Sequence, residues 1–124
     1  MKDRLEDIFN LRESFMRLIS EKVEGAYPSW PVDLQNKNSQ KVLREITFRS
    51  VEELFEALLH LKNWKDHRAA KGGFNREEYL EEMIDAFNYF LAILIMTGVD
   101  TAEFFAAYNR KHKIIVDRLS EIKS

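Results

Sequence analysis

Two short acidic clusters contain the residues of this chain whose types and spacing could do chemistry. The first holds Glu52, Glu53 and Glu56, and the second holds Glu82 and Asp85. Both clusters lie in stretches with helical periodicity, so carboxylates three residues apart project from one helical face. Two like charges about 4 Å apart repel by roughly 4 kcal/mol at an effective dielectric constant near 20. Carboxylates gathered from both helices would therefore favour a divalent cation, and Mg²⁺ at a phosphate substrate is the commonest use of such a site.

The first cluster also has a purely structural explanation. Glu53 occupies the N3 position of a capping box opened by Ser50, and Glu52 and Glu53 both fall in the first turn, where negative charge is favourable. On a helical wheel Glu53 and Glu56 point away from the apolar stripe, as solvated residues do. Taken alone, these two residues fit a solvated face better than a binding site. His60, one turn beyond Glu56, similarly fits a surface histidine better than a metal ligand.

The second cluster is harder to explain by local structure. Asp85 lies inside a helical stretch, in line with Tyr89, Ala92 and Met96, where the neighbouring residues are nearly all apolar. A carboxylate in such surroundings must be paired or bound to a metal, or it is heavily penalised. Capping does not explain Asp85, because the helix starts several turns earlier. Glu82 lies one turn before it on the same face, so the second cluster favours a binding role.

Helices must position these carboxylates. Four stretches have helical periodicity, and none alternates with period two. Capping residues and glycines place them at residues 3–24, 50–67, 75–97 and 100–122, with a possible short helix at 42–48: Ser50, Asn75 and Asp100 open helices, and Gly25 and Gly98 close them. The chain is therefore predicted to be a single all-α domain over residues 1–124, a four-to-five-helix bundle.

Apolar residues predict which faces are buried. The second long helix has an apolar stripe consisting of Val51, Leu54, Phe55, Leu58 and Leu61. The helix that contains the second acidic cluster is apolar on almost every side from Met83 to Met96, and such a helix must be buried on all sides. A single chain of this size has too few other helices to surround it. We therefore expect a homo-oligomer, either a dimer or a tetramer.

Composition narrows the function classes further. The chain has no cysteine, which excludes disulfides, thiolate zinc sites and cysteine nucleophiles. Its net charge of −2 gives no general attraction to nucleic acid. The longest near-apolar run, residues 86–96, is too short to cross a bilayer, and the acidic N-terminal residues do not resemble a targeting segment. We expect a soluble, cytoplasmic protein without a nucleic-acid or membrane partner.

The acidic residues also carry a resemblance to a known family. The pattern Glu52-Glu53-x-x-Glu56, a spacer, then Glu82-x-x-Asp85 resembles the signature of the all-alpha nucleoside triphosphate pyrophosphohydrolases, which include MazG-like proteins, dimeric dUTPases and phage-type dCTPase/dUTPases. Residues 82–118 resemble the dimeric dUTPase and dCTPase branch without a gap. The resemblance covers roughly residues 50–119, and the N-terminal third matches only as a helix. The shared features are Gly98, Glu103, Phe104-Phe105, Tyr108-x-x-Lys111, Arg118 and the earlier Trp64-Lys65.

The resemblance implies a fold of the MazG-like or dimeric dUTPase type and a role for each matching residue. Glu53, Glu56, Glu82 and Asp85 would bind Mg²⁺, for which Mn²⁺ can substitute, and Glu52 would be an outer or alternative carboxylate. Glu52 or Glu53 would accept the proton of the attacking water. The substrate-binding residues would be Lys65, Lys111, Arg118 and Tyr108, with Trp64 a candidate for stacking on a base. The implied reaction cuts a nucleoside triphosphate, preferably dUTP or dCTP, between its α- and β-phosphates.

Three departures from the family pattern bear on activity. Ile115 replaces an asparagine common in that branch, and Arg12 stands where a glutamine is usual. The customary continuation after Arg118, Arg-Gln-x-x-Gly-Tyr, is missing. The two substitutions affect base recognition more than metal binding. Two alternatives to an enzyme follow: a non-catalytic helical oligomerisation or regulatory module that retains the scaffold, and a nucleotide sensor that binds without cutting.

Overall fold

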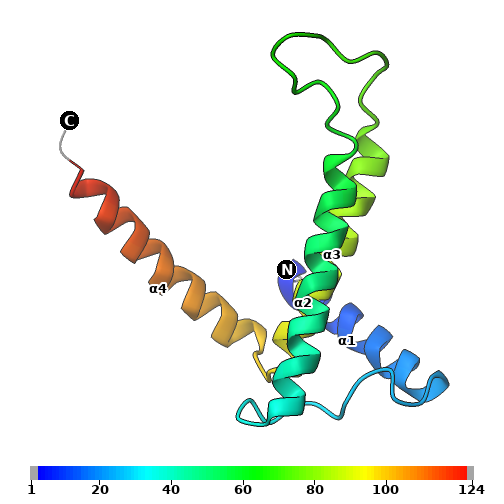
Figure 1. The fold of residues 1–124 in the computed structure, drawn as a ribbon. Helices are drawn as coiled ribbons and strands as arrows, with labels where there is room; N and C mark the ends of the chain where they lie inside the picture. Colours follow the sequence, from blue (N-terminus) through cyan, green and yellow to red (C-terminus); the bar gives the residue numbers. More distant parts are fainter. Residues whose placement is uncertain (1–2, 123–124) are drawn as a thin grey trace.

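The computed structural model describes residues 3–122 and contains four α-helices (Figure 1). They are α1 (Arg4–Lys22), α2 (Lys37–Leu58), α3 (Arg76–Met96) and α4 (Thr101–Ser120). No strand is present within these residues, so the all-α prediction is confirmed.

Short polar side chains begin three of the helices at the predicted positions. The carboxylate of Asp3 accepts hydrogen bonds from the first backbone N–H groups of α1 at 3.0 and 3.2 Å. Asn75 accepts a hydrogen bond from the N–H of Glu78 at 3.0 Å, and Asp100 accepts one from the N–H of Glu103 at 2.8 Å. Each bond satisfies an N–H group that has no partner within its helix, which explains why α1, α3 and α4 start where they do.

The prediction for the second helix was wrong at both ends. A single helix, α2, replaces the expected helices at 42–48 and 50–67, and Asn36 caps it by accepting a hydrogen bond from the N–H of Ser39 at 3.0 Å. Ser50 does not open a helix, because α2 runs through it without a break. The helix ends at Leu58, and residues 59–75 form a long loop at the far end of the α2–α3 pair (Figure 1).

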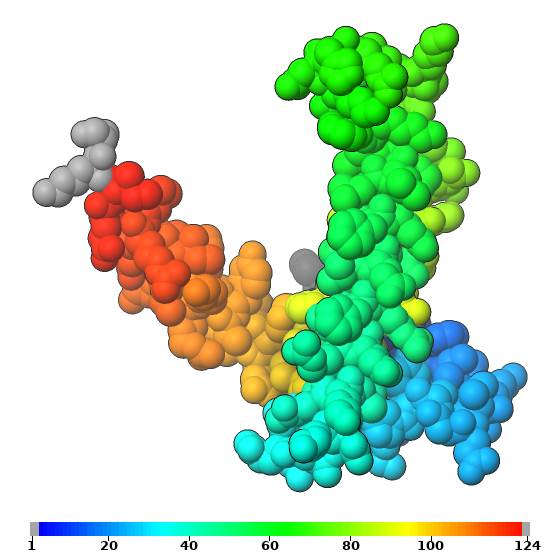
Figure 2. Space-filling model, in the orientation of Figure 1, coloured from blue at the N-terminus to red at the C-terminus, as the bar shows by residue number. Residues whose placement is uncertain are grey.

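α2 and α3 pack as an antiparallel hairpin, and α1 packs on α3 (Figure 1). The buried core lies where α1, α2 and the C-terminal half of α3 meet. It consists of Phe9, Met16, Ile46, Leu91, Ala92, Ile95 and Met96. Figure 2 shows α4 projecting from this body as a separate arm. No residue of α4 is buried, although Phe104 in its first turn lies beside Phe9 and Phe90.

Several apolar residues that the periodicity assigned to the core are exposed in this chain. The stripe of Val51, Leu54, Phe55, Leu58 and Leu61 is 40–61% exposed, so its assignment to the core was wrong for a single chain. α2 instead packs on α3 through the face that contains Ile46, Ser50, Glu53 and Ala57. α3 is not buried on all sides either, because Ile84, Phe87 and Phe90 are 41–49% exposed.

A tight turn between α3 and α4 sets the direction of the arm. The N–H of Gly98 donates to the carbonyl of Ile95 at 3.0 Å, and the N–H of Val99 donates to that of Leu94 at 3.0 Å. This pair of bonds is a Schellman motif, which requires the left-handed conformation that Gly98 adopts with φ +79°. The direction of the chain changes by 107° between α3 and α4 at this turn. Within residues 3–122 no single helix has the length and apolar character needed to span a bilayer.

Candidate metal centre

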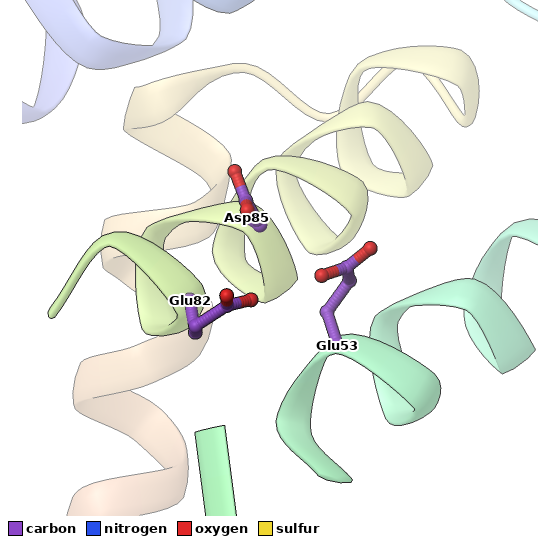
Figure 3. Close-up of side chains that lie close together, drawn as sticks. All are labelled: Glu53, Glu82 and Asp85. Atoms are coloured by element: carbon purple, nitrogen blue, oxygen red, sulfur yellow. The ribbon is translucent and has the colours of Figure 1, made fainter. Parts of the chain in front are cut away.

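Three carboxylates from two helices meet on one side of the α2–α3 hairpin. Glu53 comes from α2, and Glu82 and Asp85 come from α3 (Figure 3). One carboxylate oxygen from each residue lies within 4.8 Å of the other two. Glu53 and Glu82 are half-buried, whereas Asp85 is exposed. Glu53 faces α3, so the alternative that places it on a solvated face does not hold for this residue.

A hydrogen bond between the helices fixes the register that brings these groups together. The hydroxyl of Ser50 donates to the carbonyl oxygen of Ala86 at 2.9 Å. Ser50 lies about one turn before Glu53 on α2, and Ala86 is next to Asp85 on α3. Because the bond joins the two turns that hold the carboxylates, sliding one helix along the other would break it and separate them.

Burial and the neighbouring acidic groups raise the pKa values of two of these carboxylates. Partial burial raises the pKa of Glu53, and Glu56 raises it further by a hydrogen bond to its carboxyl and by repulsion, with smaller contributions from Asp85 and Glu82. The pKa of Glu82 is raised by desolvation, then by Glu56 and Asp85, while the charge of His60 lowers it. Glu56 therefore belongs to the same cluster, although its oxygens are not among the three closest.

No lysine or arginine of residues 3–122 forms an ion pair with this cluster. Among the described residues the one ion pair closer than 4.0 Å joins Arg17 to Glu13, which both lie on α1. The cluster can relieve its repulsion by holding protons or by binding a cation. Carboxylate oxygens are hard ligands, so the chemistry of the donors suits Mg²⁺, Mn²⁺ or Ca²⁺ rather than a soft metal.

The structure changes the argument for Asp85. Its apolar neighbours in the sequence predicted a buried carboxylate, but the side chain is exposed in the described chain. That prediction was wrong because Asp85 lies at the edge of the α2–α3 interface, where its side chain stays open to solvent. What remains in favour of a binding role is its proximity to Glu82 and Glu53. Glu52 is also exposed and is not among the three grouped carboxylates, although it directly precedes Glu53.

The predicted phosphate-binding residues of α4 are not brought to the carboxylates within one chain. Tyr108, Lys111 and Arg118 are exposed along the arm, and no Cα atom of α4 lies within 8 Å of α2. Trp64 and Lys65 lie on the loop after α2, where the Lys65 ammonium is 5.6 Å from the centre of the Trp64 ring. The expected substrate-binding set is therefore divided between the loop and the arm.

Two cavities near the carboxylates were not foreseen from the sequence. The loop encloses a cavity of about 190 Å³ whose lining includes His60, Trp64 and Phe74. A larger groove of about 440 Å³ lies between α1 and α3; it is lined by Ile8, Leu11, Arg12, Phe15, Ile84, Phe87 and Asn88. Asn88 lies one turn beyond Asp85, so this groove opens close to the acidic cluster. No sequence signal marks either cavity, because each depends on how distant segments pack.

Arg12 has an unusual position in the larger groove. Its guanidinium donates to the hydroxyl of Tyr27 at 3.3 Å and lies 5.2 Å from the ring centre of Phe15. Its Nε atom is buried and has no hydrogen-bond partner among the described residues. A buried N–H without a partner has a desolvation penalty of about 1–3 kcal/mol. This penalty belongs to the packing of Arg12 against α1 and Tyr27, because the Nε atom is not accessible from the groove.

Comparison with known proteins does not assign the chain to a family. No protein-family model matches it, no curated protein matches it, and no solved structure matches it. The functional argument therefore rests on the residues and geometry described above.

Proposed function

We propose that this chain is a Mg²⁺-dependent nucleoside triphosphate pyrophosphohydrolase that releases a monophosphate and pyrophosphate. The observation that supports this proposal is the approach of Glu53, Glu82 and Asp85 to within 4.8 Å across two helices. These residues occupy the positions that the family resemblance assigns to metal ligands. A deoxypyrimidine nucleotide, dUTP or dCTP, is the preferred substrate on the basis of that resemblance alone.

The carboxylates fit a divalent ion. Two oxygens bound to one Mg²⁺ at about 2.1 Å each lie no more than about 4.2 Å apart, so oxygens separated by at most 4.8 Å need only small side-chain adjustments. Desolvation and the repulsion among the carboxylates raise the pKa values of Glu53 and Glu82, and a bound cation would relieve that repulsion. When bound, the ion supplies Lewis acidity toward phosphate oxygens and lowers the pKa of a coordinated water.

The residues of the chain would then have separate roles in metal binding, proton transfer and substrate binding. Glu53, Glu56, Glu82 and Asp85 hold the ion, and Glu52 or Glu53 accepts the proton of the attacking water. Lys65, Lys111 and Arg118 neutralise charge on the phosphates that leave as pyrophosphate, and Tyr108 and Trp64 are further substrate contacts.

The groove between α1 and α3 offers room for the nucleoside. Its volume of about 440 Å³ is in the range of small-molecule sites, and its walls are apolar apart from Arg12 and Asn88. A triphosphate held at Asp85 has its nucleoside within reach of this groove, because Asn88 is one turn away. Apolar walls with a few directional polar groups are what recognition of a base requires.

A non-catalytic module is the second candidate, and one observation favours it. The basic residues of α4 lie away from the carboxylates in a single chain, and Ile115 among them cannot hydrogen-bond to a substrate. Such a chain would retain the scaffold for oligomerisation or regulation, or for sensing a nucleotide without cutting it.

The decisive experiment is incubation of the protein with a panel of ribo- and deoxyribonucleoside triphosphates and Mg²⁺, followed by pyrophosphate detection. We expect pyrophosphate from at least one deoxypyrimidine nucleotide and a loss of at least about 100-fold in Glu53→Gln, because the ligand set and a proton acceptor are both weakened. Glu81→Gln is the matched control, since Glu81 is an exposed glutamate of α3 outside the cluster. No turnover of any triphosphate would overturn the enzymatic proposal. Magnesium-dependent nucleotide binding without turnover would identify the sensor.

A further inference from the structure

Within residues 3–122, the aromatic contacts of α4 with α1 and α3 are made by Phe104 in its first turn, and the rest of the helix projects as an arm. The helix is 20 residues long and none of its residues is buried. In proteins most of the stability of a helix comes from packing of its apolar face rather than from helix propensity. Four of its exposed apolar residues follow the a and d positions of a heptad repeat with His112 at the remaining position, and Ile122 continues the spacing just beyond the helix. We call this set the α4 seam: Phe105, Tyr108, Ile115, Leu119 and Ile122. Two further exposed apolar residues, Ile114 and Val116, lie outside these positions. The heptad spacing of the seam is typical of a helix that packs against another helix along its whole length.

α2 has a second seam of the same kind. Phe48, Val51, Phe55 and Leu58 are spaced by three, four and three residues, and they are 40–61% exposed. This set, the α2 seam, points away from the face that packs on α3. The chain therefore has two uncovered seams with coiled-coil spacing, on helices of 22 and 20 residues.

Charged residues beside the two seams are complementary. Lys111 and Arg118 lie seven residues apart at the g positions that flank the α4 seam. Glu45 and Glu52 lie seven residues apart at the e positions that flank the α2 seam. In a parallel pair of helices the g positions of one face the e positions of the other. An α4–α2 pairing therefore brings opposite charges together. In a parallel pair of two α4 seams, Lys111 and Arg118 would face no acidic residue at an e position. In a parallel pair of two α2 seams, Glu45 and Glu52 would face no basic residue at a g position.

A single chain cannot make this pairing itself. The Schellman turn at Gly98 holds α4 at 107° to α3, and no Cα atom of α4 lies within 8 Å of α2. The turn is also packed from outside, because the N–H of Val32 donates to the carbonyl of Met96 at 2.8 Å. Folding α4 back onto its own hairpin would break these contacts.

We infer that two copies of this chain form a twofold dimer in which the α4 seam of each copy packs on the α2 seam of the other. A twofold axis makes the exchange reciprocal, so both seams of both copies are covered and the pairing closes at two copies. The pairing places a basic residue of α4 beside Glu52, the residue that precedes Glu53 of the other copy. If the proposed function holds, each site is thus completed by Lys111 or Arg118 from the second copy.

The oligomeric state tests the pairing without reference to activity. Sedimentation equilibrium at micromolar concentration should give twice the chain mass of 14.7 kDa for the wild type. Ile115→Asp in the α4 seam and Phe55→Asp in the α2 seam should each give monomers. Ile114→Asp is the matched control, since Ile114 is 40% exposed but lies outside the seam, and it should remain a dimer. Circular dichroism checks that each variant is helical. A wild-type monomer, or a dimer unaffected by both seam variants, would overturn the inference.

Cross-linking distinguishes the α4–α2 pairing from pairing of like seams. Because the chain has no cysteine, Arg118→Cys and Glu52→Cys each introduce a single thiol. A short bis-maleimide should join the two variants when they are mixed and refolded together, and should join neither variant to itself. Cross-linking of either variant only to itself would indicate a dimer through like seams and would contradict the exchange.

Complementation tests whether the second copy contributes to the site. Glu53→Gln and Lys111→Glu should each be inactive alone, and an equal mixture should recover about a quarter of wild-type activity, because half the dimers are mixed and each has one intact site. Absence of recovery despite the expected cross-link would refute the shared site and leave the dimer standing. Absence of wild-type activity would refute the proposed function instead, and the cross-link would still decide the pairing.

Discussion

The hydroxyl of Ser50 bonds to the carbonyl of Ala86 across the hairpin at 2.9 Å, and this bond sets the position of the acidic cluster. Ser50 is in the middle of α2, where serine has no advantage for helix formation. Its contribution is therefore tertiary: it ties the turn that precedes Glu53 to the turn that contains Asp85.

Replacing this serine should affect both stability and metal binding. Ser50→Ala removes one partly buried hydrogen bond, so we expect the free energy of unfolding to fall by about 1 kcal/mol in urea denaturation. We also expect weaker Mg²⁺ affinity by calorimetry, since the register of the hairpin is less restrained. Ser14→Ala is the control, because Ser14 is exposed on α1 and alanine is the better helix former. Equal effects of the two substitutions would show that the bond does not position the site.

The sequence predicted much of this fold because its local signals were unambiguous. Asp3, Asn75 and Asp100 begin helices where predicted, since each side chain accepts a hydrogen bond from a free backbone N–H. Gly98 lies in the turn that ends α3, as expected, because the Schellman turn needs a residue with positive φ.

The failures at α2 have physical causes. The Ser50 box has the right residue types, but no glycine or proline lies between Val42 and Ser50, so the helix that starts after Asn36 continues through it. Nothing near Leu58 marks the end of the helix. The loop is instead held by tertiary features, including the side-chain oxygen of Asn63, which accepts a hydrogen bond from the N–H of Ala70 at 3.1 Å.

The candidate site was predictable only in part. The spacing of Glu82 and Asp85 on one helix places them together whatever the rest of the fold does. Their meeting with Glu53 depends on the register of the hairpin, for which a single sequence has no local signal. The assignment of the α2 stripe to the core failed for a related reason: periodicity indicates that a face is apolar, and does not indicate whether its own chain covers it.

The acidic cluster should make the metal-free protein less stable at high pH. The folded-state pKa values of Glu53 and Glu82 lie above the ordinary value of 4.5. Between that value and the raised pKa values the folded protein binds more protons than the unfolded chain, so stability falls as pH rises through this window and stays reduced above it. In the presence of a chelator, Glu53→Gln should therefore melt at a higher temperature than wild type at pH 8, and the difference should shrink toward pH 4.5. A difference independent of pH would contradict this account.

Divalent ions should reverse that penalty. Binding to the folded state alone stabilises it by about 2.7 kcal/mol when the free ion is at about 100 times its Kd. We expect Mg²⁺ and Mn²⁺ to raise the melting temperature of wild type at pH 8, and to have little effect on Glu82→Gln or Asp85→Asn. Glu81→Gln should respond as wild type does, because Glu81 lies outside the cluster. A similar thermal shift in all four proteins would indicate nonspecific screening.

Substitutions at three glycines can distinguish the effect of a positive φ from the effect of a close side-chain contact at the α3–α4 turn. Gly98 has φ +79°, and a Cβ atom there would lie 3.2 Å from the Cβ of Pro31, so Gly98→Ala combines backbone strain with a close contact. Gly25 has φ +76° and open space around it, so Gly25→Ala has the strain alone, about 1–2 kcal/mol. Gly73 has neither, and Gly73→Ala should be nearly neutral or slightly stabilising. Urea denaturation should rank the losses Gly98 above Gly25 above Gly73. If Gly98→Ala cost no more than Gly25→Ala, the close approach of Pro31 to the turn would add nothing to the requirement for glycine at residue 98.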